Sequence, residues 1–226
     1  LTPPYWGTTT VLQTVSANNT DLVQLVAGPA FSLSKSSNKP NKELLPGEEV
    51  SYDIQANNIG ASSALALAKA NNVNPILLNN LSTDAAGLFN IRIDGVLASK
   101  VLFRDHIPVG TTYSGGLNTP NTNPGKVLLY RMAGDAPFAY QTTAGANVIE
   151  VAVAFDSVPA NSSLRMSFKV KVLADYEGEI KNIAELFFSD GSSSVSSQSA
   201  YPSNQVRNTT PIAPSPDLIV KKTHNA

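Results

Sequence analysis

Strict alternation of apolar and polar residues over 164–172 is the feature that most constrains the fold of this chain. The apolar members of this row are Leu164, Met166, Phe168, Val170 and Val172. Successive side chains of a strand point to opposite faces, so a period of two places this whole row on one face. The pattern therefore predicts a half-buried strand whose other face meets solvent.

The same alternation recurs in other segments that are bounded by turn sequences. Inward-facing rows are predicted over 50–56, 149–155 and 180–188, next to the turns LPGEE, NNIG and SDGS. We expect 149–155 and 164–172 to form a hairpin through the turn DSVPANSS. The dipeptide Asp94-Gly95 suits the left-handed positions of a tight turn and predicts a smaller hairpin.

These short strands predict an all-β chain, folded as an antiparallel Ig-like β-sandwich with a decorated insertion and extra terminal strands. The 226 residues, of which 42% are hydrophobic, suffice to bury a core as one large or two small domains. One helix candidate, 61–80, is ended by Asn74-Pro75 and reads as part of the insertion.

The expected organisation has four parts. Residues 1–28 form an N-terminal extension with one or two strands, a candidate for inter-subunit pairing, and 29–201 form the sandwich with its insertion at about 61–98. Residues 202–216 are rich in Pro, Thr and Asn and predict an extended linker. Residues 217–226 are expected to form an orphan strand that begins a next repeat or is donated to a neighbouring subunit. Its inward row is Leu218, Val220 and Lys222.

Composition excludes several classes of partner and site. A formal net charge of -1, without a basic cluster, argues against nucleic acid and anionic membrane surfaces as partners. No apolar run approaches the roughly 20 residues that span a bilayer. Because the chain has no cysteine, it has no disulfide, thiolate nucleophile or Cys-based metal site. We expect no cofactor, and any covalent reinforcement must use other side chains. The start at Leu1, without methionine, reads as a processed or excised segment.

Three polar side chains fall on apolar faces by strand parity. Lys35 shares a face with Phe31 and Leu33 in FSLSK. Asp105 aligns with the apolar residues of VLFRD, and Asn182 aligns with those of IKNIAELF. Each of these three positions is therefore a candidate for a buried polar group with a specific role.

The order of several motifs resembles a known family. FSLSK, LPGEEVSYDIQANNIG, VLFRDHIPVGTTY, VPANSSLRMSFKVKV and IKNIAELFFSDG follow one another over about 30–200. This order is similar to that of the conserved-repeat domain of bacterial and archaeal surface proteins, a domain-of-unknown-function family numbered eleven, and of the related isopeptide-forming domains of Gram-positive fimbriae. PDLIVKKTHN looks like the opening of a next repeat. Two features differ from the family pattern. Asn161 stands where the family has a turn glycine, and this replacement is tolerable because Asn also adopts left-handed backbone conformations. The insertion is also longer than the family norm.

The resemblance implies a self-formed amide cross-link between Lys35 and Asn182, with Asp105 as the acid. Burial would give Lys35 a neutral amine that attacks the carboxamide. A neighbouring carboxylic acid with a raised pKa would protonate the amide oxygen and shuttle protons as ammonia leaves. Two other readings stay open. In the first, the Lys35 ammonium reaches water, Asp105 caps a turn and Asn182 forms a hydrogen bond with a backbone edge; in the second, Lys35 and Asp105 form a buried ion pair without a covalent bond.

Other candidate sites have weaker signals. Asp175, Glu177 and Glu179 offer oxygen ligands for calcium, without the spacing of a recognised loop. His106 and His224 lack a nucleophile motif, so we expect no enzyme. Sequons that permit glycosylation begin at Asn18, Asn80, Asn161 and Asn208.

These observations predict a non-enzymatic extracellular or cell-surface structural protein, either a surface repeat domain or the subunit of a fibre assembled by strand addition. Its partners would be copies of itself or adjacent repeats of the same chain. The alternative is a carbohydrate- or partner-binding adhesin module that uses the segment 112–126. In this alternative, a bound ligand would stack on the aromatic side chains of Tyr5, Trp6, Tyr113, Tyr130 and Tyr140.

Overall fold

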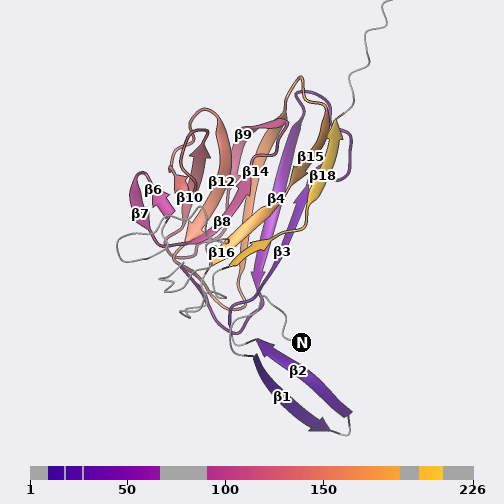
Figure 1. Ribbon diagram of the computed structural model, residues 1–226, viewed down its shortest axis with the longest axis vertical. Helices are drawn as coiled ribbons and strands as arrows, with labels where there is room; N and C mark the ends of the chain where they lie inside the picture. The colour runs from indigo at the N-terminus through magenta and orange to yellow at the C-terminus, as the bar shows by residue number, and fades with distance from the viewer. Residues whose placement is uncertain (1–9, 18, 27, 67–90, 189–198, 211–226) are drawn as a thin grey trace, which may run out of the picture.

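The computed structural model describes residues 10–17, 19–26, 28–66, 91–188 and 199–210. Every regular element within these ranges is a β-strand, and most pairings are antiparallel. Figure 1 shows two packed sheets with smaller sheets at their margins. The predicted all-β sandwich is thereby confirmed.

One face of the sandwich is a four-stranded antiparallel sheet in which the order is β3-β4-β14-β9. Its strands are β3 (Phe31–Ser37), β4 (Glu49–Asn58), β9 (Thr111–Asn118) and β14 (Ser163–Val172). The alternating row of β14 is buried at every apolar position, as its period of two predicts. Asn161, in the turn before this strand, has a φ of 56°, so it takes the left-handed conformation that glycine and asparagine adopt more readily than other residues.

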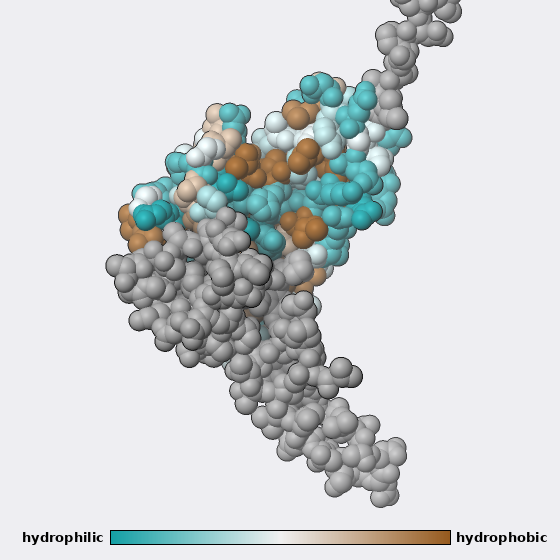
Figure 2. All heavy atoms as spheres, viewed as in Figure 1, coloured by the Kyte–Doolittle hydropathy of each residue, from teal (hydrophilic) through white to brown (hydrophobic). Residues whose placement is uncertain are grey.

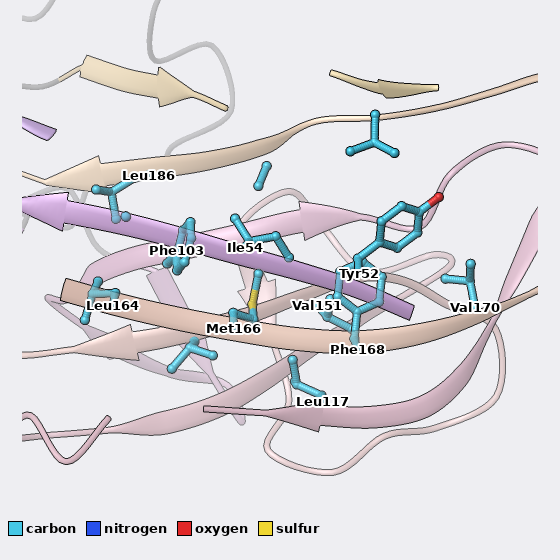
Figure 3. Close-up of a cluster of buried hydrophobic side chains, with 14 of the residues drawn as sticks. Tyr52, Ile54, Phe103, Leu117, Val151, Leu164, Met166, Phe168, Val170 and Leu186 are labelled. Atoms are coloured by element: carbon cyan, nitrogen blue, oxygen red, sulfur yellow. The ribbon is translucent and has the colours of Figure 1, made fainter. Parts of the chain in front are cut away.

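The opposite sheet has five strands in the order β10-β12-β8-β16-β17. Its members are β8 (Val101–His106), β10 (Val127–Met132), β12 (Val148–Phe155), β16 (Ala184–Phe188) and β17 (Ser199–Pro202). Between the two sheets lies the main core, in which Tyr52 and Ile54 of one sheet face Phe103 and Leu186 of the other (Figure 3). The predicted hairpin of 149–155 with 164–172 is wrong, because β12 pairs with β8 and β10 while β14 pairs with β4 and β9.

A small sheet covers the outer face of the five-stranded sheet. It has the order β11-β6-β7, with β6 (Ile91–Ile93), β7 (Val96–Ala98) and β11 (Ala139–Tyr140). Asp94 and Gly95 close the β6–β7 hairpin with φ values of 49° and 82°, as the sequence predicts. A second core forms beneath this cover, so β12 is buried on both faces rather than on one.

The C-terminal part of the sandwich is a broken hairpin. Strands β15 (Gly178–Asn182) and β18 (Val206–Thr210) pair with each other, and β16 pairs with β17. The stretch 202–216 was expected to be a linker, but its residues 206–210 form β18 because the main chain there pairs with β15. The short strands β5 (Ala64–Leu65) and β13 (Ser157–Val158) also pair.

The N-terminal residues contain β1 (Thr10–Ala17) and β2 (Asn19–Val26), which pair with each other and are drawn beyond one end of the sandwich in Figure 1.

Most of the helix candidate 61–80 lies outside the described residues, and its described part includes β5. Within the described ranges, no helix is long and apolar enough to cross a membrane. Figure 2 shows a mainly hydrophilic surface over the described part of the visible face, with separate apolar spots.

Candidate functional site

Lys35, Asp105 and Asn182 come together inside the sandwich from three separate strands. Lys35 lies on β3 opposite Ile54, and Asp105 lies on β8 opposite Ala184. Asn182 ends β15, two residues before Ala184. All three residues are buried, with exposed fractions of 5%, 1% and 3%. The inward parity that flagged them in the sequence is therefore what brings them to the interface between the sheets.

The Lys35 amine contacts the Asp105 carboxyl directly. Nζ of Lys35 donates to Oδ2 of Asp105, and neither side chain has any exposed surface. Burial lowers the pKa of the Lys35 amine to about 8, although the Asp105 carboxylate opposes the shift. Burial raises the pKa of the Asp105 carboxyl to about 7, although Lys35 and Asn182 oppose it. The two pKa values approach each other, so the neutral pair of an amine and a carboxylic acid is within easy reach.

Asn182 and Tyr52 complete the site. The Asn182 amide lies close enough to the Asp105 carboxyl and to the Tyr52 hydroxyl to act on both pKa values, although burial dominates and raises both. Nonetheless Nδ2 of Asn182, Oδ1 of Asp105 and the Tyr52 hydroxyl have no partner of hydrogen-bond geometry among the described residues. An unpaired buried polar group costs about 1–3 kcal/mol. The site therefore holds polar atoms that its folded surroundings leave unsatisfied.

Aromatic rings form one wall of this site. Nζ of Lys35 lies 4.9 Å from the ring centre of Tyr52 and 5.7 Å from that of Phe168. The two rings pack against each other with their centres 5.4 Å apart. These rings keep water away from the amine, which strengthens every electrostatic interaction inside the site. Sequence reasoning placed Tyr52 on an inward row but gave no signal that its hydroxyl would lie beside Asn182.

This geometry bears on the readings that the sequence left open. The Lys35 side chain does not reach solvent, and the Asp105 carboxyl contacts that lysine rather than capping the following turn. The side chain that caps this turn is Thr111 and not Asp105. The Thr111 hydroxyl donates a hydrogen bond to the Pro108 carbonyl, with 2.8 Å between the two oxygens. What the site can do chemically is hold an ion pair or pass a proton between the amine and the acid beside a carboxamide.

A second buried charge cluster lies under the small sheet, and sequence reasoning missed it. Glu150 has no exposed surface, and its Oε1 accepts a hydrogen bond from the Tyr140 hydroxyl. Its Oε2 lies 3.1 Å from both Nη2 of Arg131 and Nδ1 of His106, and 3.5 Å from Nη1 of Arg104. Parity alone placed Glu150 on a solvent face, because the cover comes from residues far along the chain. We read this cluster as a structural anchor for the small sheet.

The weaker candidates do not gather into sites. Glu179 pairs with Lys181 on the same strand, and among the described residues no three His, Asp or Glu side chains lie close enough to hold a metal ion. Calcium binding by Asp175, Glu177 and Glu179 stays a prediction. His106 is half exposed, and its Nδ1 contacts Oε2 of Glu150. His224 lies outside the described residues.

The sequons differ in accessibility. Asn161 is exposed in its turn, whereas Asn208 is 2% exposed and its Nδ2 donates to the carbonyls of Lys39 and Lys42 at 2.6 and 3.0 Å. Asn18 and Asn80 lie outside the described residues, as do Leu218, Val220 and Lys222 of the predicted terminal strand. In the folded chain the Asn208 amide nitrogen is therefore engaged, and only Asn161 presents a free surface among the two described sequons.

The aromatic residues proposed for ligand stacking are mostly packed. Tyr140 is buried, and Tyr113 packs edge-on against Tyr130 with ring centres 5.9 Å apart. Residues 112–118 of the expected binding loop belong to β9. Tyr5 and Trp6 lie outside the described residues. These contacts favour the reading in which the described tyrosines are core and edge aromatics.

Comparisons with known proteins give distant structural likenesses. No family model matches the chain, and no curated protein matches it, so the resemblance to the conserved-repeat family stays a prediction. The major pilin subunit BcpA of Bacillus cereus is 11% identical with a TM-score of 0.40, over 80% of this chain and 40% of that one. The N-terminal domain of the Streptococcus gordonii adhesin Sgo0707 is 12% identical with a TM-score of 0.41, over 80% and 33%.

A putative membrane-anchored protein from Corynebacterium diphtheriae is 10% identical with a TM-score of 0.48, over 90% of this chain and 43% of that one. The chain thus spans less than half of each of these three structures. Likenesses this distant carry no argument about what the chain does.

Proposed function

We propose that this chain is a non-enzymatic structural domain of the cell exterior, reinforced by an amide bond between Nζ of Lys35 and Cγ of Asn182. The observation that supports the proposal is the buried meeting of a lysine, an acid and a carboxamide from both sheets of a sandwich that has no cysteine. Such a bond would tie β3 to the C-terminal hairpin and do the work that disulfides do elsewhere.

The proposed reaction has a simple balance. A proton passes from the Lys35 ammonium to Asp105, and the neutral amine attacks Cγ of Asn182. Asp105, now a carboxylic acid, protonates the amide oxygen, transfers a proton from the attacking Nζ to Nδ2, and recovers the oxygen proton as the carbonyl re-forms. The Nζ–Cγ bond forms, the Cγ–Nδ2 bond breaks, and one ammonia leaves. The reaction occurs once per chain, so the domain is its own substrate and not an enzyme.

The unsatisfied atoms of the site give this reaction a driving force. Nδ2 of Asn182 is buried without a partner among the described residues, and it is the atom that leaves as ammonia. The first proton transfer also discharges the Lys35 ammonium, whose charge burial already disfavours. The product therefore keeps fewer costly buried groups than the starting state.

An intact-protein mass tests this proposal. We expect the purified chain to be lighter than its sequence by one ammonia, and a peptide spanning Lys35 and Asn182 to appear as a cross-linked pair. Lys35→Met and Asn182→Ala variants, each compared with its own sequence, should show the unmodified mass. A wild-type mass equal to that of the sequence would refute the bond, and a mass lower by one water would indicate a Lys35–Asp105 amide instead.

At the level of assembly we propose that the chain is a surface repeat or a fibre subunit, with copies of itself or adjacent repeats as partners. The strand predicted at 217–226, with Leu218, Val220 and Lys222 on one face, would pair with an open sheet edge of the next domain or subunit. Electron microscopy of the concentrated chain and of a chain truncated after Thr210 tests the fibre form. Filaments of the full chain that the truncated chain does not form would support strand addition, and monomers in both samples would contradict it.

A further inference from the structure

The junction between β17 and β18 carries a second set of contacts to the proposed cross-link site. Two residues there, Ser203 and Asn204, interrupt the hairpin that β15 and β16 form with β17 and β18. We call this pair the clip. It lies between the two strand pairs, where the Asn204 side chain contacts β3 and the Ser203 main chain contacts β16.

Asn204 holds the backbone of Lys35 on both sides. The Lys35 N–H donates to Oδ1 of Asn204 at 2.7 Å, and Nδ2 of Asn204 donates to the Lys35 carbonyl at 2.9 Å. β3 is an edge strand of its sheet, so the amide side chain takes the place that a neighbouring strand would occupy. Two hydrogen bonds to one residue fix its backbone, and hence the direction in which its side chain leaves the strand.

Ser203 holds β16, the strand that follows Asn182 along the chain and pairs with β8, which carries Asp105. Its N–H donates to the Ala184 carbonyl at 2.9 Å, and the Ala184 N–H donates to its hydroxyl oxygen at 3.0 Å. The same hydroxyl donates to the Asn204 carbonyl at 2.8 Å. Ala184 lies directly opposite Asp105 in the pairing of β16 with β8. The clip therefore connects the backbone of the lysine strand to the strands of the acid and the carboxamide.

We propose that the clip is a positioning device for amide formation, and that Asn204 is its main positioning residue. This inference rests on the proposed function. A reaction between two side chains of a packed interior depends on the approach of the reacting atoms, and a small misplacement lowers its rate steeply. Lys35 extends from an edge strand on a long flexible stem, so its backbone is the part that the fold must fix. The clip fixes it against the same hairpin that carries Asn182.

The rate of amide formation tests this role. Asn204 can be replaced for this purpose because its side chain is exposed, so the substitution leaves the core intact. The chain is made by cell-free synthesis, translation is stopped, and samples quenched in denaturant are followed by intact mass. Asn204→Ala should lose ammonia about ten- to a hundred-fold more slowly than the wild type. Asn204→Asp, which keeps the acceptor for the Lys35 N–H, should fall between the two.

A matched control lies at the far side of the same sheet. Asn121 makes the same pair of bonds to another strand, since its Nδ2 donates to the Ser163 carbonyl at 2.6 Å and its Oδ1 accepts from the Arg165 N–H at 2.7 Å. Asn121→Ala removes an equivalent pair of bonds away from the site and should react at the wild-type rate. Circular dichroism before the chase checks that both variants are folded, so that slow ammonia loss from a variant that fails to fold is not attributed to positioning.

Three outcomes would overturn the inference. If Asn204→Ala reacts as fast as the wild type, the clip does not position Lys35, while the cross-link itself stands. If Asn121→Ala is slowed equally, the effect belongs to general destabilisation. If the wild type never loses ammonia, both the cross-link and the role of the clip are refuted together.

Discussion

Lys35 and Asp105 meet between the two sheets, with the amine donating to the carboxyl and both side chains shielded from solvent. An ion pair in such a place gains little net stability, because the desolvation of both charges offsets their attraction. Replacing the pair by apolar residues would give a simpler core. The position of Asn182 beside the same carboxyl gives the pair a chemical use, since the acid can serve both the amine and the amide.

Asp105→Asn should stop the proposed cross-link without disturbing the packing. Asparagine has nearly the same volume, but it cannot carry a proton from the amine to the leaving nitrogen. General acid–base catalysis of this kind contributes about 10²–10⁴-fold, so the purified variant should keep the unmodified mass. Asp53→Asn is the control, because Asp53 is an exposed carboxylate on β4 that pairs only with Arg165 in the described contacts. Full loss of ammonia from Asp105→Asn would show that Asp105 is not the acid.

The unreacted site should make stability depend on pH. In Asn182→Ala, which cannot form the bond, burial keeps the Asp105 pKa well above its ordinary 3.8. This pKa is about 7 with Asn182 in place, and Asn182 lowers it, so the folded state of the variant favours the protonated acid and stability falls as pH rises from 3.8 to about 7. The Lys35 pKa is lowered from 10.5 to about 8, so stability rises again between these values. We expect the free energy of unfolding to be lowest near pH 7–8, by on the order of a few kcal/mol.

Denaturant titrations across this pH range measure that dependence. The control is the triple variant Lys35→Met, Asp105→Leu, Asn182→Ala, which removes both buried charges. The difference between the two chains isolates the site from the remaining titratable groups. A difference that stays constant from pH 4 to pH 10 would mean that neither pKa is shifted in the folded state.

Much of the site was predictable because a period of two determines which face a side chain takes. Lys35, Asp105 and Asn182 each interrupt an apolar row, and the sandwich brings apolar rows of opposite sheets together. Parity does not say which strands are neighbours, which is why the hairpin of 149–155 with 164–172 was wrong. That pairing is decided by long-range packing rather than by the turn between the two strands.

The features that sequence reasoning missed all depend on distant parts of the chain. Glu150 is buried only because residues around β6 and β11 cover the outer face of β12. Asn204 acts on Lys35 across a separation of 169 positions, and Asn208 lies at the same separation from Lys39. An isolated polar residue in a Pro- and Asn-rich segment is typical of a linker, so nothing local in this segment indicated a strand or a clip.

Loss of the cross-link should lower thermal stability strongly. The bond would close a loop of about 148 residues between Lys35 and Asn182, and constraining the unfolded chain over such a loop is worth about 5 kcal/mol. Lys35→Met, which preserves most of the side-chain volume, should therefore melt about 10–20 °C lower than the wild type. Lys169→Met, an exposed lysine of β14 paired with Glu49, is the control and should melt within a few degrees of the wild type. Equal melting temperatures for the two variants would argue against a bond at Lys35.

Glu150→Ala should destabilise the chain by about 3 kcal/mol, because it leaves Arg131 and the Tyr140 hydroxyl buried without their acceptor. The small sheet should loosen first, which hydrogen exchange of residues 91–98 and 139–141 measures. Asp53→Ala breaks an exposed pair with Arg165 and should cost less than about 1 kcal/mol. If both variants cost the same, Glu150 does not anchor the small sheet.

The two described sequons should differ when the chain is secreted by a glycosylating host. Asn161 is exposed, so its side chain can carry a glycan, whereas Nδ2 of Asn208 donates to the carbonyls of Lys39 and Lys42 and cannot keep both bonds once it is substituted. Peptide mass spectrometry of the folded, secreted protein should find glycan at Asn161 and none at Asn208. Asn161→Gly, which suits the left-handed turn position, should then remove the glycan with little loss of stability, while Asn208→Ala should cost about 2 kcal/mol because two carbonyls lose a buried donor. A glycan at Asn208 in the folded protein would show that β18 does not pack against residues 39–42 in solution.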